Sequence, residues 1–296
     1  MKIAVLGKNS QSYTQKRLKE AGLARNHEMS FINISHCYLN ISATSPKIFY
    51  RGDEKFQHLD AIIPRIDPAS TFYGCAVLRQ FETMGVYSLN NAIAMTWARD
   101  KLRAIQILAR KNLPMPITGF ADSPQEIEKL VDMVGGAPLL VKLCEGTQGK
   151  GTIFAETNQA AISVLNAFKQ LKTNMLVQEY IEEADGDDIR CIVVGKNVVT
   201  SVRRRAKGNM KKLIHTTVAP ITLTLQERKL AVRAAHALKL NFASVDLIRA
   251  KRGPLVVDIN PSPTLEAIEK ITDEDIAGHI IDFLEKHVRT KLHKDT

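Results

Sequence analysis

The sequence predicts an α/β fold that opens with a small parallel sheet and ends in antiparallel hairpins. Three observations support this expectation. Roughly the first ninety residues alternate short apolar strands with an amphipathic helix, the order of a β–α–β unit. Two later strand pairs turn at glycines, as hairpins do. The 296 residues, of which 45% are hydrophobic and 24% charged, suffice for about two or three packed subdomains.

The N-terminal elements follow from apolar runs and from the residues that end them. The first strand ends at Gly7, and the third is bounded by Pro64. The segment after Gly7 lacks the G-x-G-x-x-G pattern, so it is not a complete dinucleotide fingerprint. We expect strands at 2–6, 31–34 and 61–64, a helix at 14–24, and one continuous helix at 92–110 that the prolines of 112–116 stop.

The later elements have clearer boundaries. Ser123, Pro124 and Glu126 combine a cap, a proline at the first helical position and an acidic first turn, which together predict a helix start. Gly195 and Gly253 mark two hairpin turns. We expect strands at 138–143 and 175–181, a helix at 160–171, a hairpin of 188–194 with 197–203, a helix at 226–240, a hairpin of 244–249 with 254–260 and a helix at 275–288.

Charge and cysteine content restrict the partners and the compartment. The chain has 41 Lys and Arg against 31 Asp and Glu, a formal net charge of +10 that favours acidic partners such as nucleotides, ribonucleoprotein surfaces or carboxylate-rich peptides. The four cysteines form no C-x-x-C pair, so neither disulfides nor a zinc site are expected. Without a secretion signal or a membrane-spanning apolar run, the chain is expected to be cytoplasmic.

A glycine-rich segment at 145–151 directly follows the apolar strand that carries Lys142. Its glycines let backbone N–H groups approach an anion closely, although the segment is not a Walker A motif. A plain hairpin turn would explain the glycines equally well. Lys142 favours the anion, because a lysine inside an apolar strand needs a buried partner and a phosphate is a natural one.

Asp246, Asp258 and Asn260 form a candidate metal site on the second hairpin. Residues 258 and 260 lie two apart on a strand and therefore share a face. Positions 246 and 258 are symmetric about Arg252, so the two aspartates should lie opposite each other, where like charges repel. Mg²⁺ or Mn²⁺ would reverse that repulsion, with substrate phosphates completing the coordination. The alternative is that one aspartate caps a turn or pairs with Arg249 or Arg252.

Two further segments carry weaker signals. The strand end at Glu179 and Tyr180, with Asp188 shortly after it, could hold an adenine edge and ribose hydroxyls, although a surface strand end is the simpler interpretation of these residues alone. The basic run at 203–207, with Lys211 nearby, is of a kind that usually forms a solvated face. Here it leaves a strand between the two candidate hairpins, which makes anion binding credible. It lacks the aromatic platforms that RNA binding needs.

An ordered series of short motifs runs through nearly the whole chain. It consists of Ile62-Ile63-Pro64-Arg65-Ile66, Thr71-Phe72-Tyr73-Gly74, Ala98-Arg99-Asp100-Lys101-Leu102-Arg103, Met133-Val134-Gly135-Gly136-Ala137-Pro138, Val141-Lys142-Leu143 with Glu145-Gly146-Thr147-Gln148-Gly149, Val177-Gln178-Glu179-Tyr180-Ile181, Asp188-Ile189-Arg190-Cys191, Arg204-Arg205-Ala206-Lys207 and Asn260-Pro261-Ser262-Pro263. This series resembles the RimK-like branch of the ATP-grasp superfamily, glutamate ligases that modify a small-subunit ribosomal protein.

The resemblance implies an ATP-grasp fold and a set of site residues. A parallel-sheet pre-ATP-grasp domain would cover 1–95, two ATP-grasp subdomains would cover 96–183 and 184–290, and a tail would cover 291–296. The implied ATP-binding residues are Lys101, Lys142, Gly146, Thr147, Gln148, Gly149, Glu179, Tyr180, Asp188 and Lys211. The implied ligands of two metal ions are Asp246, Asp258 and Asn260, and the implied catalytic residues are Lys142, Arg204 and His215.

The resemblance also implies an activity and its partners. ATP, with Mg²⁺ or Mn²⁺, would phosphorylate a C-terminal carboxylate, and the amino group of glutamate would attack the acyl phosphate, with metals and lysines stabilising the transferred phosphoryl group. The acceptor would be the C-terminus of a protein or peptide such as a small-subunit ribosomal protein. A homo-oligomer, by resemblance a tetramer, is implied, and neither a membrane nor direct nucleic-acid binding is expected.

Three features depart from the family pattern. Asp258 stands where a glutamate is usual, Leu213 and Thr216 replace an asparagine and an arginine, and Thr264 replaces a glycine. The alternative expectation is therefore a nucleotide-binding regulatory protein of the same fold with weak, lost or altered ligase activity. A third hypothesis, RNA binding, rests only on the charge and on the arginine run.

Overall fold

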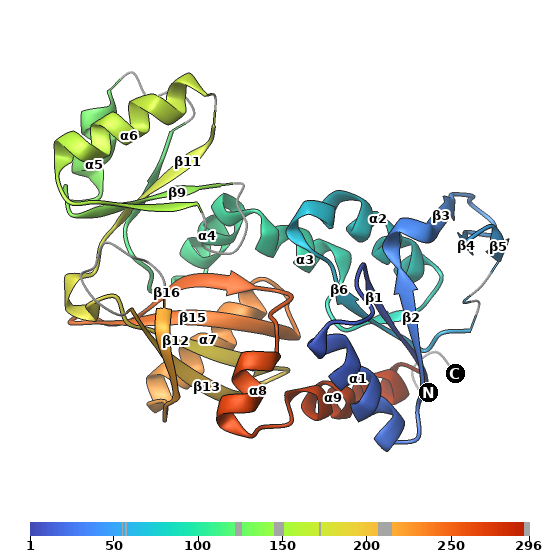
Figure 1. The fold of residues 1–296 in the computed structure, drawn as a ribbon. Coiled ribbons are helices and arrows are strands. Elements are labelled where there is room, and N and C mark those ends of the chain that lie inside the picture. The colour runs from blue at the N-terminus through green and yellow to red at the C-terminus, as the bar shows by residue number, and fades with distance from the viewer. Residues whose placement is uncertain are drawn as a thin grey trace.

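The computed structural model describes residues 1–54, 56, 58–121, 126–144, 151–171, 173–206 and 215–292. Three larger sheets and one small sheet organise this part of the chain (Figure 1). We call the larger ones the N-terminal, central and C-terminal sheets. Helices pack on one parallel sheet and on antiparallel sheets, so the predicted α/β class, with α+β character, is confirmed. Within the described residues, no helix has both the length and the apolar character needed to cross a bilayer.

The N-terminal sheet has the strand order β2-β1-β6-β7, and all its neighbours are parallel, as the β–α–β opening predicts. Alternate residues of β1 face opposite sides: Ile3 packs toward α1 and α9, and Ala4 packs toward α2. The elements of this part are β1 Lys2–Gly7, α1 Tyr13–Ala24, β2 Glu28–Asn33, β3 Cys37–Asn40, β4 Lys47–Tyr50, β5 Asp53–Glu54, β6 Ala61–Arg65, α2 Thr71–Thr83 and β7 Tyr87–Ser88, and α9 is Ile276–Leu292. Strands β3, β4 and β5 form the small sheet, which was not predicted.

The single helix predicted at 92–110 is wrong. The segment forms α3 (Ala92–Arg99) and α4 (Lys101–Arg110), separated by Asp100 in an extended conformation with φ −83° and ψ 98°. The Asp100 carboxylate accepts a hydrogen bond of 2.9 Å from the backbone N–H of Arg103. An aspartate that caps a new helix competes with continuation of the old one, and this local competition outweighed the apolar periodicity.

The central sheet is antiparallel, with the order β10-β9-β11-β8, and packs on α5 and α6 around a hydrophobic core of its own. Its elements are β8 Thr118–Phe120, α5 Ile127–Met133, β9 Leu139–Leu143, β10 Thr152–Ala155, α6 Asn158–Gln170 and β11 Met175–Glu179. The predicted helix start at Ser123 and Pro124 lies outside the described residues, and the helix itself begins at Ile127.

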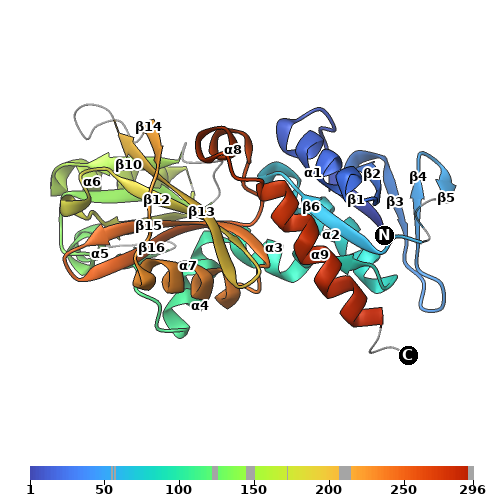
Figure 2. The same ribbon diagram turned by 90° about the horizontal axis from the view of Figure 1, so that it is seen from below.

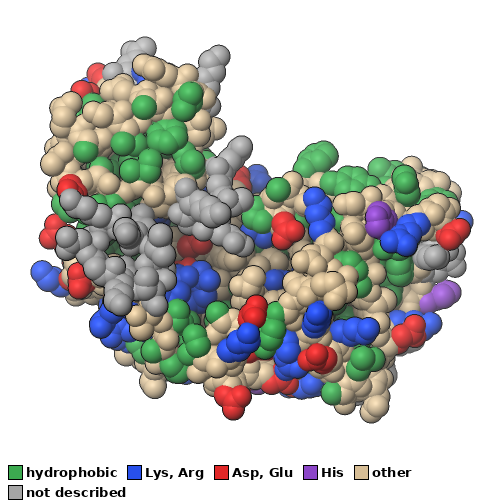
Figure 3. Space-filling view, in the orientation of Figure 1, with side chains coloured by type: hydrophobic (Ala, Val, Ile, Leu, Met, Phe, Trp, Pro, Cys, Tyr) green, Lys and Arg blue, Asp and Glu red, His purple; other side chains and the backbone are tan. Residues whose placement is uncertain are grey.

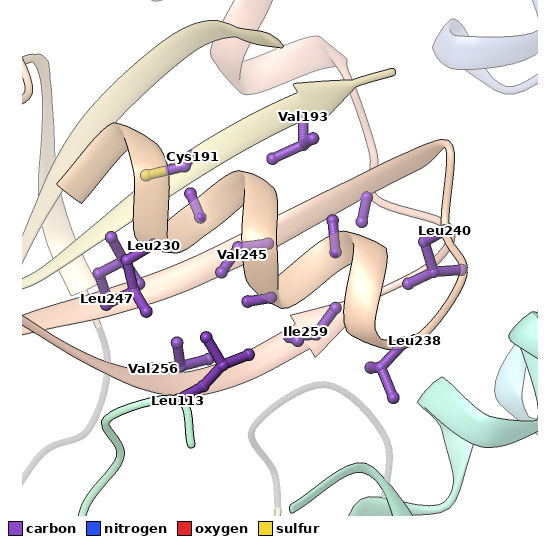
Figure 4. Close-up of a cluster of buried hydrophobic side chains, with 14 of the residues drawn as sticks. Leu113, Cys191, Val193, Leu230, Leu238, Leu240, Val245, Leu247, Val256 and Ile259 are labelled. Carbon is purple, nitrogen blue, oxygen red and sulfur yellow. The ribbon is translucent and has the colours of Figure 1, made fainter. Parts of the chain in front are cut away.

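The C-terminal sheet is antiparallel, with the order β14-β13-β12-β15-β16. Helix α7 covers one face, where Leu230 and Leu238 pack among Cys191, Val245 and Ile259 (Figure 4). Its elements are β12 Asp188–Val194, β13 Asn197–Ala206, β14 His215–Pro220, α7 Leu225–Ala237, β15 Phe242–Ala250, β16 Gly253–Asn260 and α8 Glu266–Thr272.

The second hairpin places Asp246 opposite Asp258, as predicted, but by a different route. The turn holds only Lys251 and Arg252, because Ala250 already pairs with Gly253. A bulge between Asp246 and the next residue shifts the register by one and restores the aspartate pair. The expected symmetry about one central turn residue was therefore wrong, although the pair itself was correct.

The N-terminal and C-terminal sheets are joined by a shared core and by one buried amide. Strands β1 and β12 contribute to the same hydrophobic cluster, and so does α9, which runs beside the N-terminal sheet (Figure 2). The side chain of Asn90 is 1% exposed; its Nδ2 donates to the carbonyl oxygens of Phe242 (2.7 Å) and Pro261 (3.1 Å), and its Oδ1 accepts from the N–H of Asn241 and of Phe242. All hydrogen-bonding groups of this amide are thus used between the two sheets.

Replacing Asn90 by alanine is expected to lower the free energy of unfolding by about 2–4 kcal/mol, because buried backbone groups lose their partners. Urea denaturation followed by circular dichroism measures this change. Asn40→Ala, at an exposed position of β3, is the matched control and should leave the midpoint near the wild-type value. Equal midpoints for both variants would contradict the role assigned to Asn90.

Candidate active site

A cavity of about 420 Å³ lies between the central and C-terminal sheets, with α4 along one side. In the space-filling view the surface is hollowed between the lobe that carries α5 and α6 and the remainder of the molecule (Figure 3). Lys142 of β9 and Lys101 at the start of α4 line this cavity together with the hairpin β15–β16. The predicted site residues that line it are Lys101, Lys142, Glu179, Tyr180, Asp188, Arg204, Asp246, Asp258 and Asn260.

The remaining predicted site residues are not placed at the cavity. Gly146, Thr147, Gln148, Gly149 and Lys211 lie outside the described residues. His215 is the first residue of β14, where its backbone pairs with Ala206. Its side chain is likewise outside the described part of the structure.

Lys142 is the cation that the central sheet presents to the cavity. Strands β10 and β11 flank it, and its Nζ donates a hydrogen bond of 2.6 Å to Oε1 of Gln178, whose Nε2 donates in turn to Thr118. Burial lowers the pKa of Lys142 to about 8, although Asp258 opposes the shift; Lys101 lowers the pKa further. A neutral hydrogen-bond partner does not compensate a buried charge, so an anion in the cavity would favour the protonated lysine.

The lowered pKa of Lys142 predicts a pH dependence of anion binding. The amine is protonated below a pH of about 8 and loses its charge above it, so affinity for ADP should fall as the pH rises through this value. From pH 7 to pH 9 we expect a loss of about tenfold, measured by calorimetric titration. Lys142→Arg, which stays charged, should bind ADP with little change over the same range. If the ADP affinity of Lys142→Arg fell equally steeply between pH 7 and pH 9, the Lys142 amine would not be the group that causes the pH dependence.

Asp246 lies at the centre of a buried network of ion pairs. It is 4% exposed and accepts hydrogen bonds from Arg190 at 2.8 and 2.7 Å and from Arg204 at 2.7 Å. Arg204 also donates to Asp188 at 2.6 Å. Burial alone would raise the pKa of Asp246, but the two guanidinium groups outweigh it and lower the pKa to about 2. Two carboxylates and two arginines thereby neutralise each other inside the sheet.

The partners of Asp246 differ from the alternatives considered from the sequence. Arg249 pairs with Glu227, and Arg252 pairs with Glu179, so neither reaches Asp246. Arg190, which does, was not among the predicted site residues. The signal that could have identified it is its position: on β12 it lies directly opposite Asp246. A charged residue inside an apolar strand needs a partner on the neighbouring strand.

The three arginines at 203–205 all form ion pairs with carboxylates of the same chain. Arg204 points inward to Asp188 and Asp246, whereas Arg203 and Arg205 both pair with Asp187. Strand alternation explains this division, because residues two apart share a face. Within the described residues, Arg203 and Arg205 thus remain exposed but paired, whereas Arg204 belongs to the inner network.

The strand end at Glu179 closes one edge of the cavity. The carboxylate of Glu179 accepts hydrogen bonds from Arg252 at 2.6 and 2.7 Å, and its pKa is lowered mainly by Arg252. The N–H of Glu179 donates to the carbonyl oxygen of Ile117, so this donor is already used. Tyr180 packs edge-to-face against Phe154, with 4.8 Å between the ring centroids, and gives the cavity an aromatic wall.

Comparison with known families decides what this arrangement represents. Residues 1–95 match the model of the RimK PreATP-grasp domain, and residues 98–284 match the model of the RimK-like ATP-grasp domain. The chain belongs to the RimK-like ATP-grasp ligases. The resemblance inferred from the motifs is therefore confirmed, as are the ATP-grasp fold and the preceding parallel-sheet domain.

Curated relatives of this RimK-like ligase extend over its whole length. A protein of Legionella pneumophila (strain Corby) named probable alpha-L-glutamate ligase is 51% identical over 292 residues, which cover 98% of this chain and 97% of the relative. A protein of the same name from Aliivibrio fischeri (strain MJ11) is also 51% identical, over 99% of this chain and 98% of the relative.

Solved structures of lower identity share the fold of this RimK-like ligase. The ATP-grasp ligase PsnB, in complex with a phosphomimetic variant of a minimal precursor, Mg and ADP, superposes with a TM-score of 0.75 at 20% identity, covering 96% of this chain and 97% of PsnB. D-alanine–D-alanine ligase from Bacillus anthracis superposes with a TM-score of 0.68 at 18% identity over 100% of both chains.

Proposed function

We propose that the protein is an ATP-dependent carboxylate–amine ligase that adds glutamate, through an acyl phosphate, to the C-terminal carboxylate of a protein or peptide. The observation that carries the proposal is the cavity in which Lys101 and Lys142 lie on one side and the carboxylates of the hairpin β15–β16 on the other. Relatives named probable alpha-L-glutamate ligase, 51% identical over nearly the full length, support glutamate as the amino acid. The proposed acceptor is a small-subunit ribosomal protein, and the proposed assembly is a cytoplasmic tetramer.

The nucleotide would occupy the cavity with its phosphates near Lys101 and Lys142. The charge of both lysines, and the burial of Lys142, support this orientation. Adenine would lie against Tyr180 and the backbone at the end of β11, and ribose would lie near Asp188, which Arg204 orients. Gly146, Thr147, Gln148, Gly149 and Lys211 complete the proposed ATP-binding set, within subdomains 96–183 and 184–290 that follow the domain 1–95.

The hairpin β15–β16 provides a donor set that suits Mg²⁺, and we propose Asp246, Asp258 and Asn260 as the ligands. Among the described residues, no group of three or more His, Cys, Asp or Glu side chains is arranged to hold a metal by itself. Two carboxylates and one amide match the pattern in which substrate phosphates and water supply the other ligands. Asp258 is exposed and makes no hydrogen bond or ion pair with the described residues, so its oxygens are available.

The proposed reaction uses the cations of the cavity mainly for positioning. An oxygen of the substrate carboxylate attacks the γ-phosphorus of ATP, the bond to the β-phosphate oxygen breaks, and an acyl phosphate and ADP form. The amine of glutamate then attacks the acyl carbon, phosphate leaves, and one proton is released. Lys142 and Arg204 would neutralise charge on the transferred group, with His215 as a third proposed catalytic residue. Bound Mg²⁺ would supply further charge neutralisation at the phosphates.

The test is ADP release by the purified protein with ATP, Mg²⁺, isotopically labelled glutamate and a cell extract, followed by mass spectrometry of the proteins. The proposal expects ADP release that requires both an amino acid and an acceptor, and a label at the C-terminus of one protein. Thermal stabilisation by ATP and Mg²⁺ without any product, across all amino acids, would instead favour the nucleotide-binding regulatory protein. The replacements at Leu213, Thr216 and Thr264 motivate that alternative.

A further inference from the structure

Two arginines at the carboxyl end of the N-terminal sheet form no ion pair with a carboxylate among the described residues. Arg65 ends β6 and is 8% exposed, and its Nη1 has no hydrogen-bond partner. Arg99 ends α3; its Nη2 donates to the carbonyl oxygen of Ile66 at 2.7 Å, but its buried Nε has no partner. Neither arginine forms an ion pair with a carboxylate in the described part of the chain.

This arrangement differs from that of Arg190 and Arg204, the half-buried arginines that line the cavity. Arg190 and Arg204 each face carboxylates at hydrogen-bond distance. Arg65, by contrast, has its pKa lowered to about 10, first by burial and then by the charge of Arg99, and only the exposed Asp67 opposes the shift. A buried and a half-buried guanidinium close together are unfavourable unless an anion joins them, and planar guanidinium groups match the geometry of a carboxylate.

The surroundings of Arg65 contain further unused polar atoms. Of the five buried side-chain atoms without a partner among the described residues, four belong to segments that meet at this edge: Gln15 Oε1, Arg65 Nη1, Ser70 Oγ and Arg99 Nε. Gly7 pairs with Arg65 across the strands, and a Cβ added to Gly7 would lie 2.8 Å from Nε2 of Gln15 and 3.0 Å from the carbonyl oxygen of Arg65. Glycine at this position thus allows Gln15 to lie over the strand ends.

The arginine pair lies beside the candidate active site. Ala98 and Lys101, which precede and follow Arg99 in sequence, both line the cavity. Burial lowers the pKa of Arg99, and among the groups that oppose this shift Asp67 comes first, followed by Cys75 and Asp258 of the acidic hairpin. The pair therefore approaches the hairpin from the N-terminal sheet, whereas Lys142 approaches from the central sheet.

We propose that Arg65 and Arg99 form a binding site for a substrate carboxylate, separate from the phosphate site at Lys101 and Lys142. The inference rests on the proposed ligase function, in which both substrates carry carboxylates that the reaction does not consume. The carboxylate belongs either to the incoming amino acid or to the acceptor, and its chemistry is the same in both cases. Gln15 lies over the strand end beside Arg65, and its Oε1 offers a partner for an ammonium or amide group of the same substrate.

Steady-state kinetics of Arg65→Gln and Arg99→Gln test the site. ADP release is measured while glutamate, a tripeptide ending in glutamate, or ATP is varied. We expect the KM for one carboxylate substrate to rise by about tenfold or more, because a charge-assisted bidentate contact is lost. The KM for ATP should stay near the wild-type value. Arg79→Gln, at an exposed position of α2, is the matched control and should change none of the three constants.

The results show which substrate supplies the carboxylate, and they distinguish a wrong proposal from a misfolded variant. A rise in KM for glutamate assigns the site to the amino acid, and a rise for the tripeptide assigns it to the acceptor. An equal rise in KM for ATP, or unchanged constants in both variants, overturns the proposal. A variant that loses the thermal shift caused by ADP and Mg²⁺ is misfolded. It is then replaced by Arg99→Lys, which keeps the charge but lacks the planar guanidinium. This variant should still raise the same KM.

A second readout is independent of ligation. If the wild-type protein joins no glutamate, calorimetric titration of L-glutamate, and of the tripeptide with a free or an amidated C-terminus, is carried out on the complex with ADP and Mg²⁺. Binding that requires the carboxylate and is lost in Arg99→Gln supports the site although the proposed function fails. Binding that Arg99→Gln leaves unchanged, or no binding of either probe to the wild type, overturns the site.

Discussion

Replacing Lys142 by methionine is expected to lower kcat/KM for ligation by about a thousandfold, because the cation proposed to face the transferred phosphoryl group is removed. The same change is expected to stabilise the fold at pH 7 by about 1–3 kcal/mol, because the native environment disfavours the charged amine. Methionine keeps the length of the side chain and its apolar contacts on β9. Loss of activity with a gain in stability distinguishes a functional lysine from a structural one.

The measurements are ADP release and urea denaturation of the same preparations. Lys129→Met, at an exposed position of α5 on the same part of the fold, is the matched control and should alter neither quantity much. Retention of activity within about tenfold in Lys142→Met would remove the phosphate role from this residue. A large loss of stability would show that the lysine serves packing instead.

Asp246→Asn is expected to lower the free energy of unfolding by about 3–5 kcal/mol, since two buried guanidinium groups lose their shared carboxylate. Asparagine preserves the shape but not the charge. Activity should be lost as well, because Arg204 would be displaced and a proposed metal ligand removed. Asp132→Asn, on the exposed side of α5, is the control and should unfold at the wild-type denaturant concentration.

Acid denaturation provides a second test of the contribution that the Asp246 ion pairs make to stability. Its pKa is depressed in the folded state, so its contribution to stability is fully present above a pH of about 4 and is lost as the pH falls toward about 2. Asp246→Asn lacks this titration and should lose less stability than the wild type over that window. Parallel acid curves for the two proteins would count against the ion-pair network as the source of the stability.

Much of the site could be predicted because it follows local patterns. Alternation along a strand places Asp258 and Asn260 on one face. The pairing of Asp246 with Asp258 was also expected, although a bulge rather than the turn symmetry produces it. Lys142 stands out because a single charge interrupts an apolar strand. The order of the strands in the parallel opening likewise follows from connection rules that depend on sequence order.

The features of the site that were not predicted depend on pairings between segments far apart in the sequence. The ion pairs of Asp246 require the register of β12 against β15, and the link between Arg252 and Glu179 joins residues in different sheets. No local periodicity encodes such contacts. The break at Asp100 was missed for another reason: a capping side chain decided the backbone conformation of a segment whose apolar spacing favours one helix.

The connection between the sheets determines which part of the molecule can move. The N-terminal and C-terminal sheets share a hydrophobic cluster and the buried amide of Asn90, so they behave as one rigid frame. The central sheet has its own core and meets the frame through polar links such as that of Arg252 with Glu179. Opening and closing around a ligand should therefore move the lobe of the central sheet, while the frame that carries the hairpin β15–β16 stays still.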